Sequence, residues 1–101
     1  MHFVYILYSE GSQIYYVGQT PDLYTRLLFH NELSEKSFTS RHRPWELARS
    51  ITVRNRSEAV LLERYIKGRK SKAYVQRLVA DDEAVMKLLQ KLNIEPLAPG
   101  G

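Results

Sequence analysis

The N-terminal two thirds of this chain carry side chains that could together hydrolyse a phosphodiester bond. Tyr5 and Tyr16 lie in two short segments rich in aromatic and β-branched residues, and Arg26, His30 and Glu63 follow in that order. A phenol can take a proton, a guanidinium can balance phosphate charge, and a carboxylate can hold a metal ion. These residues are therefore the candidate catalytic set.

Each of these residues also has an ordinary structural interpretation. Tyrosines in strands are usually packing residues, and we expect Tyr24 to be one as well. Arg26 and His30 are four residues apart, and such a helical pair usually forms a solvated stripe. Glu63 and Lys67 could form an i,i+4 ion pair worth only about 0.3 to 0.5 kcal/mol. The catalytic interpretation depends on the whole set occurring in this order.

Composition indicates one small basic domain without cysteine. The chain has 101 residues, with 15 basic and 11 acidic side chains, a net charge of +4 and a pI of about 9.5. Residues 1–80 hold 13 basic and 7 acidic side chains, a balance of +6, whereas residues 81–101 hold 2 and 4, a balance of −2. Positive charge suits a polyanionic partner. The lack of cysteine excludes disulfides, thiolate zinc sites and a thiol nucleophile.

The first residues give no export or membrane signal. They lack a basic region followed by a long apolar stretch, and no later segment approaches eighteen apolar residues. We therefore expect a cytoplasmic protein with no membrane partner.

Hydrophobic periodicity predicts three strands and four helices. The strands are expected at residues 3–9, 14–19 and 45–53. The helices are expected at about residues 21–31, 57–68, 71–79 and 82–92. Thr20 is the expected cap of the first helix, and the polar residues 34–43 are an expected loop.

The element order β-β-α-β-α-α-α predicts an α/β fold. We expect a small sandwich in which a three-stranded, largely antiparallel sheet is flanked by helices. Residues 1–95 are expected to form a single domain, with residues 96–101 as a flexible tail.

The tyrosine segments resemble the paired motifs of the GIY-YIG nuclease superfamily. Tyr5 stands where the first motif ends in tyrosine, although Phe3 replaces its glycine. The second motif is matched by Tyr16-Val17-Gly18, with valine in place of isoleucine. The predicted sheet is the fold that this resemblance implies.

The remaining site residues follow the same family pattern. The family arginine corresponds to Arg26, a common histidine companion to His30, and the metal-binding glutamate to Glu63. The likeness covers about residues 3–79 and is strongest to small stand-alone members that resemble excision-repair nucleases. The predicted helix at residues 82–92 lies outside it.

The resemblance implies a metal-dependent DNA endonuclease. Glu63 would bind one Mg²⁺ or Mn²⁺ ion, and Arg26 would clamp the phosphate. Tyr16 is the leading candidate for general base, with Tyr5 positioning water or substrate. His30 either shares in proton transfer or contacts phosphate, and the sequence leaves both alternatives open.

Further basic residues predict contacts with the nucleic-acid backbone. The candidates are Lys36, Arg41, Arg43, Arg64, Lys67, Arg69, Lys70 and Lys72. Phosphate contacts supply affinity without base recognition, and no base-reading motif is present. We therefore expect structure-selective nicking in DNA repair or recombination, and RNA stays open as a substrate.

Two other classes of protein fit the sequence. One is a non-catalytic nucleic-acid-binding module that keeps the nuclease fold. The other is an assembly subunit in which residues 81–95 dock a protein targeting partner. The sequence does not distinguish a monomer from a weak dimer.

Overall fold

A single antiparallel sheet organises the molecule. The computed structural model describes residues 1–33 and 37–97. The strands are β1 (His2–Ser9), β2 (Ile14–Thr20) and β3 (Glu46–Val53), in the order β2-β1-β3. The central strand β1 pairs antiparallel with both neighbours, which leaves β2 as an edge strand.

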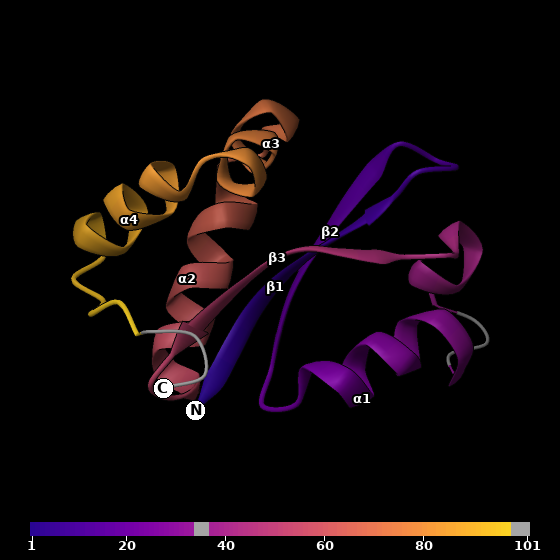
Figure 1. Cartoon of the computed structure of the whole chain (residues 1–101), viewed down its shortest axis with the longest axis horizontal. Coiled ribbons are helices and arrows are strands. Elements are labelled where there is room, and N and C mark those ends of the chain that lie inside the picture. The colour runs from indigo at the N-terminus through magenta and orange to yellow at the C-terminus, as the bar shows by residue number, and fades with distance from the viewer. Residues whose placement is uncertain (34–36, 98–101) are drawn as a thin grey trace.

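Helices cover both faces of this sheet. They are α1 (Leu23–Leu28), α2 (Arg56–Gly68), α3 (Lys72–Ala80) and α4 (Asp82–Lys91). Figure 1 shows α2, α3 and α4 on one side of the sheet and α1 on the other. The predicted α/β fold, with its three-stranded sheet flanked by helices, is confirmed.

Side-chain alternation along β1 divides the core in two. Val4 and Ile6 are fully buried among the residues of α2, α3 and α4. Tyr5 and Leu7 point to the opposite face, where they pack with Trp45 beside α1. Because successive side chains of a strand face opposite ways, this alternation places Tyr5 on the α1 side.

The helix beyond the resemblance also contributes to the core. Val85, Leu88 and Leu89 of α4 are buried in the same cluster as Val4 and Ile6. Residues spaced three and four apart share one face of a helix, so α4 covers the core with a single apolar stripe. No helix in the described part of the chain is long and apolar enough to span a membrane.

The first helix is capped two residues later than predicted. Asp22 is the N-cap, and its carboxylate accepts a hydrogen bond from the Thr25 N–H at 3.2 Å. Thr20 instead accepts from the Asp22 N–H at 3.1 Å and forms the turn before the helix. The prediction of Thr20 as the cap was therefore wrong.

Two short turns stand where the sequence predicted helix end and loop. The chain leaves α1 through a π-helical turn, η1 (Phe29–Leu33). A 3-10 turn, η2 (Thr39–His42), lies inside the expected loop at 34–43. Residues 34–36 of that loop and residues 98–101 of the expected tail lie outside the described residues.

Candidate active site

The hydroxyl group of Tyr5 lies at the centre of the candidate site. Tyr5 pairs with Gly18 across β1 and β2, and a Cβ built on Gly18 would collide with the Tyr5 hydroxyl. The Tyr5 ring therefore crosses the edge strand where Gly18 has no side chain. Sequence reasoning gave Gly18 no role of its own, although the strand register places a glycine opposite the tyrosine.

His30 holds the Tyr5 hydroxyl from the inside of the fold. Its Nε2 lies 2.9 Å from Tyr5 Oη, and its Nδ1 lies 2.9 Å from Thr39 Oγ1. Burial, aided by the charges of Arg26 and Arg43, lowers the pKa of His30 to about 4. A neutral ring that donates to Thr39 and accepts from Tyr5 satisfies both contacts.

This placement narrows the alternatives left open for His30. The side chain is 1% exposed and both ring nitrogens already have protein partners. The π-helical turn η1 carries His30 inward, and such turns are frequent at functional sites. The geometry favours a role that acts through Tyr5 over direct contact with phosphate.

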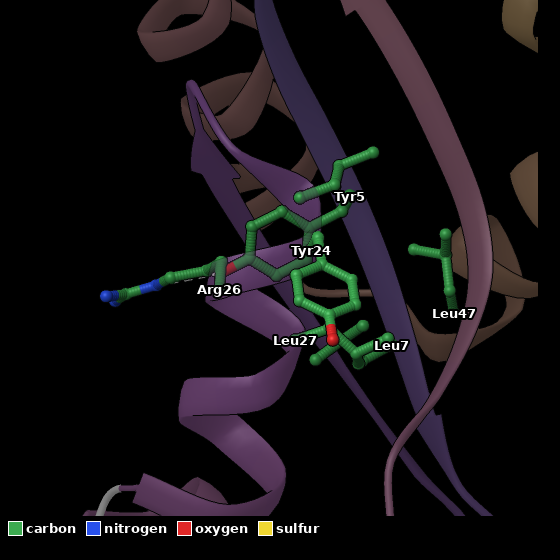
Figure 2. Close-up of a pocket in the computed structure, with 7 residues that line it drawn as sticks. Tyr5, Leu7, Tyr24, Arg26, Leu27 and Leu47 are labelled. Atoms are coloured by element: carbon green, nitrogen blue, oxygen red, sulfur yellow. Dashed lines mark hydrogen bonds between the residues drawn. The ribbon is translucent and has the colours of Figure 1, made fainter.

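Arg26 reaches the same hydroxyl from α1. Its Nε donates to Tyr5 Oη at 3.4 Å, and its guanidinium carbon lies 4.6 Å from the centre of the Phe29 ring. The dashed line in Figure 2 marks the bond to Tyr5, and the guanidinium end extends beyond the Tyr5 ring. Arg26 and His30 thus converge on one atom, and the solvated-stripe interpretation is wrong.

Burial keeps the Tyr5 phenol protonated. It is the largest cause that raises the pKa of Tyr5, and the charges of Tyr16 and Glu63 add to it. The hydrogen bond from Arg26 acts in the opposite direction. The proton on Tyr5 is therefore available for its bond to His30.

Tyr16 lies beside this group and is half-buried. Its ring centre is 4.9 Å from that of His30, 6.4 Å from that of Tyr5 and 6.2 Å from that of Trp45. Lys67 of α2 places its Nζ 5.8 Å from the centre of the Tyr16 ring. The contact joins the edge strand β2 to α2.

Glu63 lies on α2 and pairs with Lys67, the residue that contacts the Tyr16 ring. Its carboxylate lies 2.8 Å from Lys67 Nζ, so the i,i+4 ion pair considered from the sequence does form. The effect of Glu63 on the pKa of Tyr5 shows that its charge acts on the site. Glu63 therefore forms the ion pair with Lys67 and also lies close enough to Tyr5 to affect its pKa.

The carboxylate of Glu63 is a suitable single ligand for a hard cation. Among residues 1–33 and 37–97, no group of three or more His, Asp or Glu side chains could hold a metal ion. Mg²⁺ commonly uses one or two carboxylates and completes its shell with water and substrate phosphate. Glu63 could supply one such ligand, provided that Lys67 leaves the carboxylate.

The residues predicted to bind phosphate do not form one surface, and three of them lie together beside β2. Lys67, Lys70 and Lys72 border a groove of about 290 Å³ between β2 and the helices. Lys72 Nζ also donates to the Gln13 carbonyl oxygen at 2.6 Å, which ties α3 to the β1–β2 hairpin. These lysines therefore line a groove that begins beside Tyr16 and Glu63, which Lys67 contacts.

The remaining basic residues are more dispersed. Arg43 Nε donates to the His30 carbonyl oxygen at 2.7 Å, so this arginine supports the site. Arg69 lies over Tyr74 at 4.8 Å, away from Lys67 on α2, while Arg41 and Arg64 are exposed. Lys36 lies outside the described residues.

Two hollows beside Arg26 had no sequence signal. One, of about 460 Å³, is polar and is lined in part by His2, Gln19 and Arg56. The other, of about 130 Å³, is apolar and is bounded by Tyr24, which is 80% exposed (Figure 2). The expectation that Tyr24 is a packing residue was wrong. The sequence predicted no role for Arg56.

Comparison with known proteins agrees with this geometry. A family model of the GIY-YIG catalytic domain matches residues 1–77. No curated protein and no solved structure gives a significant match. The family consists of endonucleases that generally use divalent metal ions, so a nucleic-acid substrate follows. The matched segment contains Tyr5, Tyr16, Arg26, His30 and Glu63, and the chain belongs to the GIY-YIG family.

Proposed function

We propose that this protein is a metal-dependent DNA endonuclease that nicks DNA of a particular structure during repair or recombination. The observation that carries the proposal is the convergence of Arg26 and His30 on the Tyr5 hydroxyl, next to Tyr16 and Glu63. A phenol, a fixed cation and a carboxylate within one site are suited to phosphodiester hydrolysis.

The proposed reaction is an in-line attack of water on phosphorus. A new bond forms between water oxygen and phosphorus, the bond from phosphorus to the leaving sugar oxygen breaks, and that oxygen takes a proton from solvent. Tyr16 is the general base that accepts the proton of the attacking water. Tyr16 is favoured over Tyr5 as the base because water reaches it more readily: Tyr16 is half-buried, whereas Tyr5 is 2% exposed.

Tyr5 and Arg26 have positioning and charge-balancing roles in this mechanism. Tyr5 is fixed by His30 and by Arg26 Nε, so it can orient water or substrate without changing its protonation state. The other guanidinium nitrogens of Arg26 donate to the phosphate as negative charge develops there. His30 acts by holding Tyr5.

A divalent ion held by Glu63 would supply positive charge at a phosphate oxygen and lower the pKa of a bound water. Glu63 is suited to this ligand role because its side chain is 19% exposed and therefore open to solvent on one side.

DNA of altered structure is the substrate class that these residues support. Lys67, Lys70 and Lys72 can contact backbone phosphates, which are the same in every sequence. A preference for a flap, junction or damaged strand would then come from DNA shape. We place this activity in the cytoplasm, with RNA as a second substrate to be compared.

The test is cleavage of labelled duplex, flap, fork, four-way junction and single-stranded DNA and RNA, with Mg²⁺, Mn²⁺ or EDTA. Glu63→Gln and Tyr16→Phe should each lower metal-dependent nicking by at least about 100-fold. Matched controls are Glu58→Gln, which removes a carboxylate from another i,i+4 ion pair, and Tyr15→Phe, which removes the adjacent phenol of β2. Both controls should cleave like the wild type.

The controls also identify contaminating nuclease, since its activity would persist in every variant. A wild-type protein that binds DNA and cleaves none of these substrates would overturn the proposal. The chain would then be a non-catalytic binding module, and the Glu63–Lys67 ion pair at 2.8 Å would have a structural role alone.

A further inference from the structure

A second charged cleft lies between α2, α3 and α4. Its volume is about 430 Å³, and its walls include Tyr65 of α2 and Arg69, the C-cap of that helix. Tyr65 follows Glu63 by two residues, which corresponds to about 200° around a helix. The cleft is therefore on the flank of α2 that faces away from Glu63.

Two tyrosines and two cations form the frame of this cleft. The rings of Tyr65 and Tyr74 meet edge to face, with centres 6.4 Å apart. The guanidinium carbon of Arg69 lies 4.8 Å from the Tyr74 ring centre and 6.0 Å from that of Tyr65. Lys91 of α4 places its Nζ 5.4 Å from the Tyr65 ring centre. These contacts hold both cations close to the same aromatic ring.

The stacked guanidinium keeps its binding capacity. Contact with an aromatic ring uses the face of the guanidinium, whereas its N–H groups point outward in the plane. Arg69 is thus held in place while its N–H groups can still donate to the oxygens of an anion. An ordered cation loses less conformational entropy on binding than a mobile one.

The Tyr65 hydroxyl adds to this arrangement. A hydrogen bond from Lys91 is the largest cause that lowers the pKa of the Tyr65 phenol, and Arg69 also contributes. The phenol oxygen is therefore shared between two cations, which keeps their charges near one another.

The acidic residues of the cleft already have partners. Asp81 caps α4 by accepting from the Glu83 N–H at 2.9 Å, and Glu83 pairs with Lys87 at 3.5 Å. Within the described residues, Arg69, Arg77 and Lys91 form no ion pair with a carboxylate. The cleft holds four cations, Arg69, Arg77, Lys87 and Lys91, against the two carboxylates Asp81 and Glu83, so its balance of charge is +2.

We propose that this cleft binds a backbone phosphate of the nucleic acid, at a site separate from the catalytic residues. The inference rests on the proposed function, since it assumes a nucleic-acid substrate. The cleft has a volume of about 430 Å³ and cations from α3, α4 and the end of α2, which is more space than one small anion requires and favours a segment of strand.

The two sites can serve one substrate. A helix with its side chains is about 10–12 Å wide, so a strand crossing the outer face of α2 would reach both flanks within a few nucleotides. Arg64 is exposed on the same helix between the two sites. Lys91 belongs to α4, outside the segment that matches the family model, so this contact adds to the matched domain.

Binding without metal tests the inference independently of cleavage. The full-length chain is titrated against labelled duplex, flap and single-stranded DNA in EDTA, from 50 to 200 mM salt, by fluorescence anisotropy. Lys91→Ala should weaken binding about three- to tenfold and reduce the slope of log affinity against log salt by about 0.7–0.9, the loss of one phosphate contact. Tyr65→Phe should weaken binding as well, because Lys91 loses its partner.

Lys87→Ala is the matched control. It removes the same charge from α4 one turn earlier and from the same cleft, but Lys87 already pairs with Glu83. The salt slope of this variant should fall clearly less than that of Lys91→Ala. Circular dichroism establishes that each variant is folded, and Tyr65→Phe keeps the test decisive if Lys91→Ala does not fold.

Equal affinities and slopes for Lys91→Ala, Tyr65→Phe and Lys87→Ala would overturn the inference. It would also fail if inorganic phosphate shifted the NMR signals of Tyr65 while Lys91→Ala bound DNA like the wild type, since the cleft would then hold a small anion only. A difference between Lys91→Ala and Lys87→Ala in a protein that cleaves nothing would refute the nuclease proposal and retain this site. Normal cleavage without that difference would support the nuclease proposal and refute this site.

Discussion

Gly18 allows the Tyr5 ring to cross β2, so its substitution disturbs the site without removing a reactive group. In Gly18→Ala the new Cβ meets the hydroxyl end of Tyr5, which is also held by His30. We expect a loss of stability of about 1–3 kcal/mol, typical of overpacking, together with loss of cleavage. Urea unfolding and the nicking assay measure the two effects.

Gly11→Ala is the control for this prediction. A Cβ at Gly11 meets nothing within 4 Å, so stability and cleavage should stay close to those of the wild type. If Gly18→Ala behaved like Gly11→Ala, the Tyr5 ring would not depend on the space at Gly18.

His30 predicts how stability depends on pH. Its pKa is lowered from 6.5 to about 4, so the unfolded chain takes up a proton below pH 6.5 that the folded protein does not accept until about pH 4. The free energy of unfolding should therefore fall as the pH drops from 6.5 to 4, by up to about 1.4 kcal/mol per pH unit. Denaturant titrations at several pH values measure this slope.

His30→Gln should abolish that contribution, because glutamine keeps hydrogen-bonding atoms but does not titrate. His42→Gln is the control, since His42 bonds Ser12 at an exposed position outside the Tyr5 network. An unchanged slope in His30→Gln would show that other groups produce the acid sensitivity.

Among the elements, α1 has the most direct effect on the site, because this short helix carries Arg26. Its cap Asp22 accepts from the Thr25 N–H at 3.2 Å and from the Thr25 hydroxyl at 2.8 Å. Asp22→Ala should cost about 1 kcal/mol and lower cleavage several-fold, because fraying of α1 releases Arg26 from Tyr5. Thermal unfolding and initial cleavage rates measure both.

Ser71→Ala provides a comparison of the same kind on another element. Ser71 caps α3 by accepting from the Tyr74 N–H at 3.1 Å, so the stability cost should be similar. Cleavage should be retained, because α3 carries none of the catalytic set. Equal losses of cleavage in both variants would mean that only global stability matters.

The order of the elements could be predicted from the sequence, whereas several details of the site could not. Strands and helices follow from local periodicity, but the pairing of Gly18 with Tyr5 depends on the strand register. The burial of His30 depends on Thr39, nine residues later, and on the π-helical turn, neither of which has a periodic signal. The exposure of Tyr24 likewise depends on how α1 packs on the sheet, which local periodicity does not determine.

At the scale of the whole molecule, the central strand connects two cores with different tasks. The core on the α1 side holds Tyr5 and Trp45 beside the candidate site. The core on the other side includes residues of α2, α3 and α4, and α2 reaches back to the site through Glu63. Stability and catalysis should therefore respond to different substitutions.

The helix α4 tests this separation. Leu89 is 3% exposed within the larger core, so Leu89→Ala should cost about 2–5 kcal/mol in the free energy of unfolding. Met86 is 41% exposed on the same helix, and Met86→Ala should change stability by no more than about 0.5 kcal/mol. Cleavage per folded molecule, measured at low temperature, should equal that of the wild type in both, because neither residue belongs to the catalytic set or lines the cleft with Lys91. If Leu89→Ala left stability unchanged, the apolar face of α4 would not pack on the core in solution and would be free to dock a targeting partner, as the assembly-subunit interpretation requires.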